Sequence, residues 1–459
     1  MVFKLWDRFR WIFCQLEILR DCLPASVRRT LSELPESLDE TYERILKEIK
    51  KPNRCLAQRV LHCLVVAIRP LRVAELAEVL AVDLDDSEGI PRLNVDWRWE
   101  DQEQALLFAC SSLIAIVGHG RSRVVQFSHF SVKEFLTSSR LSTASGEVSA
   151  YRIDLENAHT ILAQACLGVL LQTHDETDGD ALEDHLLARY AAIHWTTHAQ
   201  FGEVSSRLKK GMEYLFNPAK PHFRAWLTLY DIDTKPGEDS TFLGFAPDSK
   251  CAATPLYYAA LCGFYDLVED LITKYPQDVN ANGGYCMRPL IAALAGEHFQ
   301  TADLLHRNGA DPHVQGRLKS FPLHPAASLE SLEVVQKLIA YGADIDARDE
   351  DGWTPLYWAS EGYYFKDGSV FRLLLECGAD VNARARADNF DNFTTPLHRA
   401  SAYGAVEVVR LLLEHGADVE ALNVQGKTVL QVVGKGPGRE VDQGGCDEVT
   451  RLLVEHGAK

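Results

Sequence analysis

The spacing of apolar and polar residues divides the chain near residue 250. Beyond it, short helical runs follow one another in pairs, most clearly from Thr395 to Val419. There Leu397 and Ala400 share one helical face, and Val408–Leu413 supplies the apolar face of a second helix. Before residue 250, helical runs of uneven length surround two β-like runs. We therefore expect a mainly α protein with two unlike halves.

An internal repeat organises the second half. The tripeptide Gly-Ala-Asp recurs at Gly309, Gly342, Gly378 and Gly416, in steps of 33, 36 and 38 residues. This tripeptide and a second marker recur with the same spacing, and together they predict six units, which start near residues 251, 285, 318, 351, 391 and 425. The second marker, a Pro-Leu pair or its equivalent, stands at Pro255, Pro289, Pro322, Pro355, Pro396 and Val429.

Each marker has a local physical role. Pro396 suits the first turn of a helix, and Thr395 before it can cap free amides. Gly404 suits a left-handed helix end, and Gly416 ends the second helix. In these residues the chain resembles the ankyrin family, over 251–459. The resemblance implies a solenoid of six ankyrin repeats whose fingers and inner helices form a concave protein-binding surface.

The first half predicts a winged-helix-like unit and further helices. Leu113–Val117 and Arg123–Phe127 are β-like and flank a Gly-rich hairpin signal. Helical runs lie on both sides of this hairpin, and a Pro-, Gly- and Asp-rich linker occupies 231–250. We expect a helical segment at 1–51, a winged-helix-like domain at 52–140, a helical region and linker at 141–250, and the repeats at 251–459.

Several segments of this half resemble the part of fungal NACHT–ankyrin proteins that follows the nucleotide-binding domain. The residues that carry the resemblance are Phe9–Leu16, Leu34–Tyr42, Arg69-Pro70-Leu71 and Ser128–Leu136. In that family a STAND-type NTPase core precedes a winged helix and a repeat sensor. The resemblance therefore implies the C-terminal portion of such a protein, beginning where the nucleotide-binding part would be finishing.

Composition restricts the class of protein. The net charge of −18 and a pI near 5.4 oppose gathering along a polyphosphate. The 11 cysteines form no CxxC pair, and Cys63 and Cys166 fall in apolar helical runs, which is typical of reduced, buried thiols. Charged residues interrupt the apolar run of Met1–Leu19, and no stretch is long enough to span a membrane. We expect an intracellular protein of the cytoplasm and/or nucleus.

Two glycine-rich motifs suggest nucleotide binding and fail on their context. Gly426-Lys427-Thr428 lacks the glycine that a P-loop requires five positions earlier, where Ala421 stands. Gly434–Gly438 has no preceding strand, and Pro437 disrupts its turn, so we interpret it as a flexible insert. No nucleotide cofactor is expected.

Other candidate sites also have structural interpretations. We expect His129 to cap or pack at a helix start. His194 and His198 have the spacing of a zinc pair but no third ligand, so we place them on a helical surface. Glu75 and Glu78 are expected on the exposed face of their helix, where they oppose DNA binding. The sequence thus predicts no enzyme, metal, small-molecule substrate or direct nucleic-acid contact.

Function is expected in the repeats, as a protein-interaction scaffold or regulatory adaptor. The alternative is a transcriptional co-regulator that docks a DNA-binding factor, for example in fungal pathway or secondary-metabolism regulation; an NTPase comes third. Trp353 is an interface anchor in this hypothesis, and packing against the next finger is its alternative role. The candidate partner-binding residues are Arg348, Glu350, Asp351, Trp353, Glu361, Asp391, Asn392, Thr394 and Tyr403.

Overall fold

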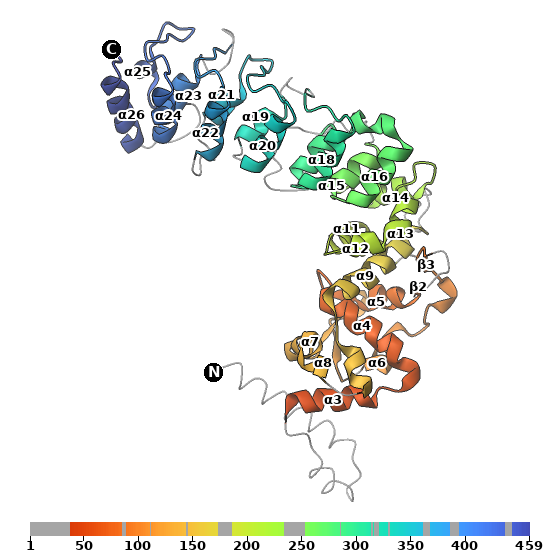
Figure 1. Cartoon of the computed structure of the whole chain (residues 1–459). Coiled ribbons are helices and arrows are strands. Elements are labelled where there is room, and N and C mark those ends of the chain that lie inside the picture. The colour runs from red at the N-terminus through yellow and green to blue at the C-terminus, as the bar shows by residue number, and fades with distance from the viewer. Residues whose placement is uncertain are drawn as a thin grey trace, which may run out of the picture. The chain divides into compact units, whose positions relative to one another are not determined.

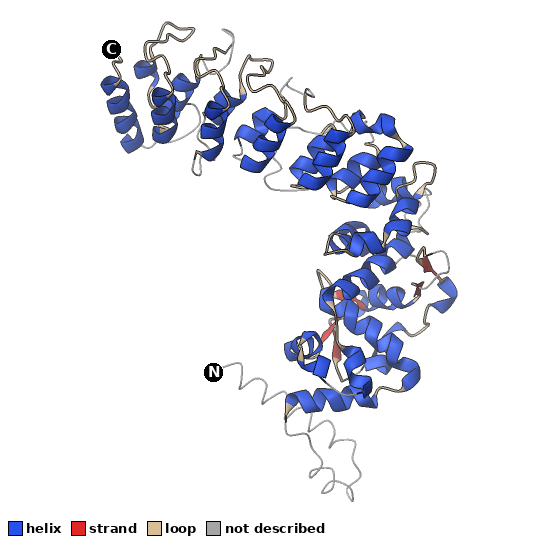
Figure 2. Ribbon diagram, in the orientation of Figure 1, coloured by secondary structure: helices blue, strands red, loops and turns tan. Residues whose placement is uncertain are grey.

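The computed structural model forms two compact units, one ending at Ile232 and one beginning at Asp233. Both are mostly helical, and the named strands of the described residues all lie in the first unit (Figures 1 and 2). The structure describes residues 37–84, 89–110, 112–143, 146–172, 186–233, 253–284, 286–313, 315, 321–328, 331–360, 368–385, 394–436 and 443–459.

A three-stranded antiparallel sheet of order β1-β5-β4 centres the first unit. Val125 of the middle strand pairs with Leu71 on one side and Ile116 on the other, and its side chain is buried. Helix, strand, two helices and a hairpin follow in the order of a winged helix, which confirms the predicted fold. These elements are α4 (Arg54–Val66), β1 (Leu71–Arg72), α5 (Val73–Leu80), α6 (Gln102–Cys110), β4 (Ile114–Val117) and β5 (Val124–Phe127).

Shorter elements surround this winged helix. Tyr42 reaches from α3 to α7, where its hydroxyl lies 2.8 Å from Ser131 Oγ. His129 caps α7, because its Nδ1 accepts a hydrogen bond from the Ser131 amide, and this confirms the predicted capping role. The surrounding elements are α3 (Leu38–Glu48), η1 (Lys51–Asn53), β2 (Val82–Asp83), β3 (Arg92–Leu93), η2 (Val95–Trp97), η3 (Gly120–Ser122), α7 (Phe130–Thr137), α8 (Arg140–Thr143) and η4 (Gly146–Tyr151).

Five further helices of the described residues surround an aromatic core in the first unit. The rings of Trp195 and Trp226 meet edge to face at 5.4 Å, and Trp226 Nε1 donates to the Ala192 carbonyl over 3.0 Å. α9 packs against both α4 and α11. The helices are α9 (Leu155–Leu170), α11 (Ala188–Ala199), α12 (Val204–Arg207), α13 (Lys209–Leu215) and α14 (His222–Leu229).

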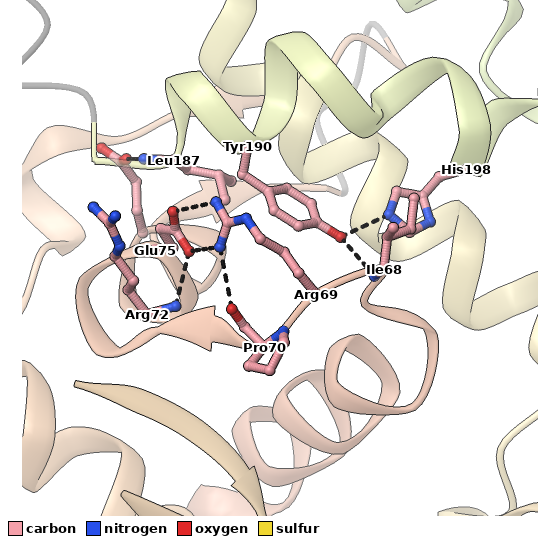
Figure 3. A network of polar contacts seen from close by, with 9 residues as sticks. Ile68, Arg69, Pro70, Arg72, Glu75, Leu187, Tyr190 and His198 are labelled. Atoms are coloured by element: carbon pink, nitrogen blue, oxygen red, sulfur yellow. Dashed lines mark hydrogen bonds and ion pairs between the residues drawn. The ribbon is translucent and has the colours of Figure 1, made fainter. Parts of the chain in front are cut away.

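A buried polar network corrects the expectation for the acids of α5 (Figure 3). Glu75 is 3% exposed and Glu78 is 2% exposed. Both oxygens of Glu75 accept from the Arg69 guanidinium, over 2.8 and 2.7 Å, and one also accepts from the Arg72 amide. Glu78 pairs with Arg98. Because each carboxylate has a cationic partner, burial of its charge is offset, and these acids face the interior rather than solvent.

The same network overturns the surface placement of His198 (Figure 3), which is fully buried. Its Nε2 lies 2.9 Å from the Tyr190 hydroxyl, and its Nδ1 lies 2.8 Å from His159 Nδ1. Burial, with His159 and His194 nearby, lowers the pKa of His198 to about 3, so the ring is neutral at neutral pH. Among the described residues no His, Cys, Asp or Glu cluster is arranged to hold a metal ion.

Cys63 and Cys166 are both completely buried, as expected for reduced core thiols. Burial raises the pKa of Cys63 to about 12 and that of Cys166 well above its ordinary value. Both side chains therefore remain protonated and serve as small apolar residues of the core.

The second unit stacks helix pairs in chain order, from green to blue in Figure 1. The predicted local signals of the fifth pair are confirmed, since Thr395 caps α23 and Gly404 ends it with a φ of 69°. The helices of the described residues are α15 (Pro255–Leu261), α16 (Tyr265–Lys274), α17 (Pro289–Ala295), α18 (Phe299–Arg307), α19 (Leu323–Ser328), α20 (Leu332–Ala340), α21 (Pro355–Ala359), α22 (Ser369–Glu376), α23 (Pro396–Tyr403), α24 (Val406–Glu414), α25 (Val429–Val432) and α26 (Gln443–Glu455), with the turn η5 (Pro276–Asn280) after α16.

Asp233, which precedes the first repeat, is hydrogen-bonded to it. The buried Tyr257 hydroxyl donates to Asp233 over 2.8 Å and accepts from the Cys286 amide over 2.9 Å. One side chain therefore joins the start of this unit to its first two repeats.

The two glycine-rich motifs have structural roles in the last repeat. Gly426 takes a φ of 73° in a finger turn, and Thr428 caps α25. The Gly434 and Gly436 amides donate to carbonyls of α23, which holds the beginning of the predicted flexible insert against that helix. Residues 437–442 lie outside the described residues.

Candidate protein-docking surface

The fingers of the fourth and sixth repeats are short turns, each built around one acceptor side chain. In the fourth repeat the Asp349 carboxylate accepts from the amides of Asp351 and Trp353, over 3.1 and 2.8 Å. In the sixth, Asn423 accepts from Gln425 and Lys427 in the same way, at 2.9 Å each. Because local side-chain acceptors satisfy the backbone amides, these two fingers have a defined shape without a partner.

Buried histidines anchor these fingers to the inner helix of the preceding repeat. His324 Nε2 lies 2.9 Å from the Trp353 carbonyl, and His398 Nε2 lies 3.4 Å from the Lys427 carbonyl. A carbonyl only accepts, so Nε2 carries the proton in both rings. Burial lowers the pKa of each imidazole. The neutral rings therefore act as fixed hydrogen-bond donors that position the fingers.

Arginines join neighbouring fingers into a row. Arg348 Nη1 donates to the Arg384 carbonyl over 2.7 Å, and Arg384 Nη2 donates to the Leu422 carbonyl over 2.8 Å. These three residues occupy the same position of successive repeats, directly after Ala347, Ala383 and Ala421. The fourth, fifth and sixth fingers are consequently linked through backbone carbonyls.

A second series of bonds runs along the finger bases. Asp346 accepts from the Asp380 amide over 3.0 Å, and Asn382 accepts from the Asp418 amide over 2.8 Å. The Asn382 amide group also donates to the Gly416 carbonyl over 3.2 Å. Thus Asp346 and Asn382 each position the finger that follows.

Trp353 lies in a layered stack at the base of the fourth finger. Its ring is stacked on Tyr357, with centroids 5.3 Å apart, and meets Trp358 edge to face at 6.3 Å. The Arg399 guanidinium lies 4.9 Å from the Trp353 ring. The same indole packs against a buried cluster of Tyr357, Ala402 and Val432. This half-buried ring therefore contributes to packing between the repeats.

The structure separates the candidate partner-binding residues by exposure. Arg348 is exposed, whereas Glu350, Asp351, Trp353 and Tyr403 are partly buried. All but Tyr403 belong to one finger, and Tyr403 lies on α23. Thr394 is only 3% exposed, so its side chain is not presented on the surface. Three candidates lie outside the described residues: Glu361, Asp391 and Asn392.

Sequence reasoning missed two exposed residues of the same row and one beside it. Arg384 and Leu422 continue the position of Arg348, and Leu422 is 47% exposed. Val424, two residues further, is 40% exposed. The repeat alignment that identified Arg348 also contains Arg384 and Leu422, and this signal was available in the sequence.

Comparisons with known proteins match both units. The pattern described as "GPI inositol-deacylase, winged helix domain" matches residues 42–147. Ankyrin-repeat patterns match residues 251–281, 290–385 and 374–433. No helix of the described residues is both long and apolar enough to cross a membrane.

Three relatives illustrate the range of similar proteins. Azaphilone pigments biosynthesis cluster protein L of Monascus ruber is 30% identical over 299 residues, which is 61% of this chain and 61% of that protein. A Danio rerio protein named as a palmitoyltransferase, ZDHHC13, is 31% identical over 39% of this chain and 27% of its own. Ankyrin repeat domain-containing protein SAT10 of Stachybotrys chartarum is 29% identical over 42% of this chain and 9% of its own. The chain thus spans less than two thirds of each of them.

Proposed function

We propose that this ankyrin-repeat protein with an N-terminal winged-helix domain is a non-enzymatic scaffold or regulatory adaptor that holds a protein partner on its fingers. The observation that carries the proposal is the row in which Arg348 and Arg384 join three successive fingers. A surface that is already ordered loses little conformational entropy when it binds, so more of the contact energy appears as affinity.

The proposed surface combines charge with aromatic and apolar groups. Arg348 and Arg384 supply exposed cations, Glu350 and Asp351 supply carboxylates, and Leu422 supplies an apolar side chain. Such mixtures, with Arg and aromatic residues, are typical of protein interfaces.

The other candidates contribute to this proposal in different ways. Trp353 packs at the base of the fourth finger and is partly exposed, and the buried Thr394 acts only through the backbone of its segment. Tyr403 extends the surface onto α23. The proposal also retains Glu361, Asp391 and Asn392 as contact residues.

A second candidate function is a transcriptional co-regulator in fungal secondary metabolism, with a DNA-binding factor as the partner. The printed name of the Monascus ruber relative, a biosynthesis cluster protein, favours it. Location distinguishes the two, because a co-regulator acts in the nucleus and an adaptor is also expected in the cytoplasm. A winged helix followed by ankyrin repeats is also the order that a relation to NACHT–ankyrin proteins implies, and we include this relation in the proposal.

Affinity capture from cells with the whole chain as bait tests the docking surface. Glu350→Lys with Asp351→Lys reverses charge on the fourth finger, and Arg384→Ala removes a link of the row. We expect partners retained by the unchanged chain to be lost by both variants, at an unchanged melting temperature. The matched control is Tyr265→Ala, which alters a 38% exposed aromatic on α16. If both variants retain every partner, the fingers are not the docking surface.

A further inference from the structure

Exposed apolar side chains also occur close together in sequence in the first unit, before α6 and on it. Val95 is 57% exposed, Trp97 49%, Trp99 46% and Phe108 62%. Large aromatic side chains left half in water lose hydrophobic free energy that burial would recover. All four lie within fourteen residues of sequence, and exposed apolar side chains concentrated in one region mark interaction sites. We call Val95–Phe108 the tryptophan segment.

The fold holds this segment in place from below. Arg98, between the two tryptophans, is directed inward and pairs with Glu78, whose side chain is 1% exposed. The other oxygen of Glu78 accepts from the Leu187 amide. Asn94 accepts from the Asp96 amide over 3.0 Å and thereby starts the η2 turn that carries Trp97. The tryptophans are consequently presented by an ordered backbone rather than by a loose loop.

A shallow cavity of about 280 Å³ opens along α6. Leu107 and Phe108 give it apolar walls, and Asp101, Glu103 and Gln104 give it polar ones. Asp101 accepts from the Gln104 amide over 2.9 Å, which fixes the helix start at the edge of the cavity. The cavity can accommodate an apolar side chain of a partner, with carboxylates beside it.

The charge of the tryptophan segment selects the partner. It contains four acids and one base, a formal charge of −3, and the base is Arg98, which is directed toward Glu78. Glu103 pairs with Arg123, while Asp96, Glu100 and Asp101 are exposed around the tryptophans. Lys50 borders only the far end, 6.0 Å from the Phe108 ring.

This acidic rim favours cations. Indole faces attract Lys and Arg, and nearby carboxylates strengthen that attraction. The position of α6, after α5 and before the hairpin, corresponds to the helix that helix-turn-helix proteins insert into DNA. Here its start carries acids, which repel phosphates. We propose that the tryptophan segment is a second docking surface, and that its occupant is a basic, apolar-bearing segment of a protein partner.

Defined peptides test this proposal on the whole chain. The probe is a labelled fourteen-residue helical peptide of lysine and leucine, and a glutamate–leucine peptide of the same pattern is its counterpart. We expect fluorescence anisotropy to show binding of the lysine peptide, weakened by salt, and at least ~10-fold weaker binding of the glutamate peptide. Trp97→Ala with Trp99→Ala should weaken binding of the lysine peptide by ~10-fold or more, as expected for hot-spot aromatics.

Charge reversal provides an independent arm. Asp96→Lys with Glu100→Lys changes two exposed side chains and should shift preference toward the glutamate peptide. If the tryptophan variant unfolds, the charge-reversal variant still tests the proposal. Tyr265→Ala again serves as the control. The proposal is overturned if the lysine peptide does not bind, if the charge reversal leaves its binding unchanged, or if a single-stranded oligonucleotide binds more tightly than the peptide.

Discussion

Trp353→Ala is the most informative single change in the repeats, because it removes the ring that stacks on Tyr357 and contacts the Arg399 guanidinium. Truncating a buried Trp to Ala costs about 3–5 kcal/mol of unfolding free energy. Trp353 is only partly buried, so we expect a smaller loss of about 2 kcal/mol, including that of the aromatic pair. In a unit of this length, such a loss lowers the melting temperature by roughly 4–8 °C.

Thermal melts followed by circular dichroism on the whole chain measure this effect. Trp353→Phe keeps a ring over Tyr357, so its loss of unfolding free energy should be about half that of Trp353→Ala. Val424→Ala, at a 40% exposed position of the sixth finger, should leave the melt unchanged. A Trp353→Ala protein that melts within about 1 °C of the unchanged chain would refute the packing role and return Trp353 to the interface anchors.

Three further predictions concern other parts of the chain. Glu75→Ala should cost about 2–4 kcal/mol in urea unfolding, and Arg69→Ala should cost less in that background than alone, because the two side chains share one ion pair. His198 is protonated near pH 6.5 in the unfolded chain and only near pH 3 in the folded chain. The free energy of unfolding should therefore fall as the pH drops from 6.5 toward 3, by up to about 1.4 kcal/mol per pH unit. His198→Gln should reduce this pH dependence between pH 6.5 and 5. Residues 233–459 should melt cooperatively and at a higher temperature than 251–459, since only the longer fragment keeps the Asp233 bond to the first repeat, and equal melting temperatures would contradict this.

Local signals made the repeats predictable from the sequence. A cap such as Thr395 and a left-handed end such as Gly404 act within one or two turns of the chain. The β-like runs on either side of Gly118–Ser122 predicted the hairpin for the same reason, since pairing and turn lie close together in sequence. Fold class followed from such signals.

Contacts between distant residues were not predictable in the same way. The sequence pattern places Glu78 on the polar face of a short helix. Its burial depends on Arg98 and on the Leu187 amide, 109 positions away in sequence. His198 is buried because Tyr190 and His159 accommodate its ring. The candidate surface was subject to the same limit: repeat spacing located Arg348, but not the carbonyl that it reaches.

The bonds of Arg348 and Arg384 to main-chain carbonyls have an evolutionary consequence. A carbonyl is present whatever side chain its residue carries, so substitutions at Glu350, Asp351 or Leu422 need not disturb the links between fingers. Descendants of this chain can therefore exchange their contact residues one at a time while the surface keeps its form. The arrangement permits recognition to drift toward new partners without intermediates that have lost their architecture.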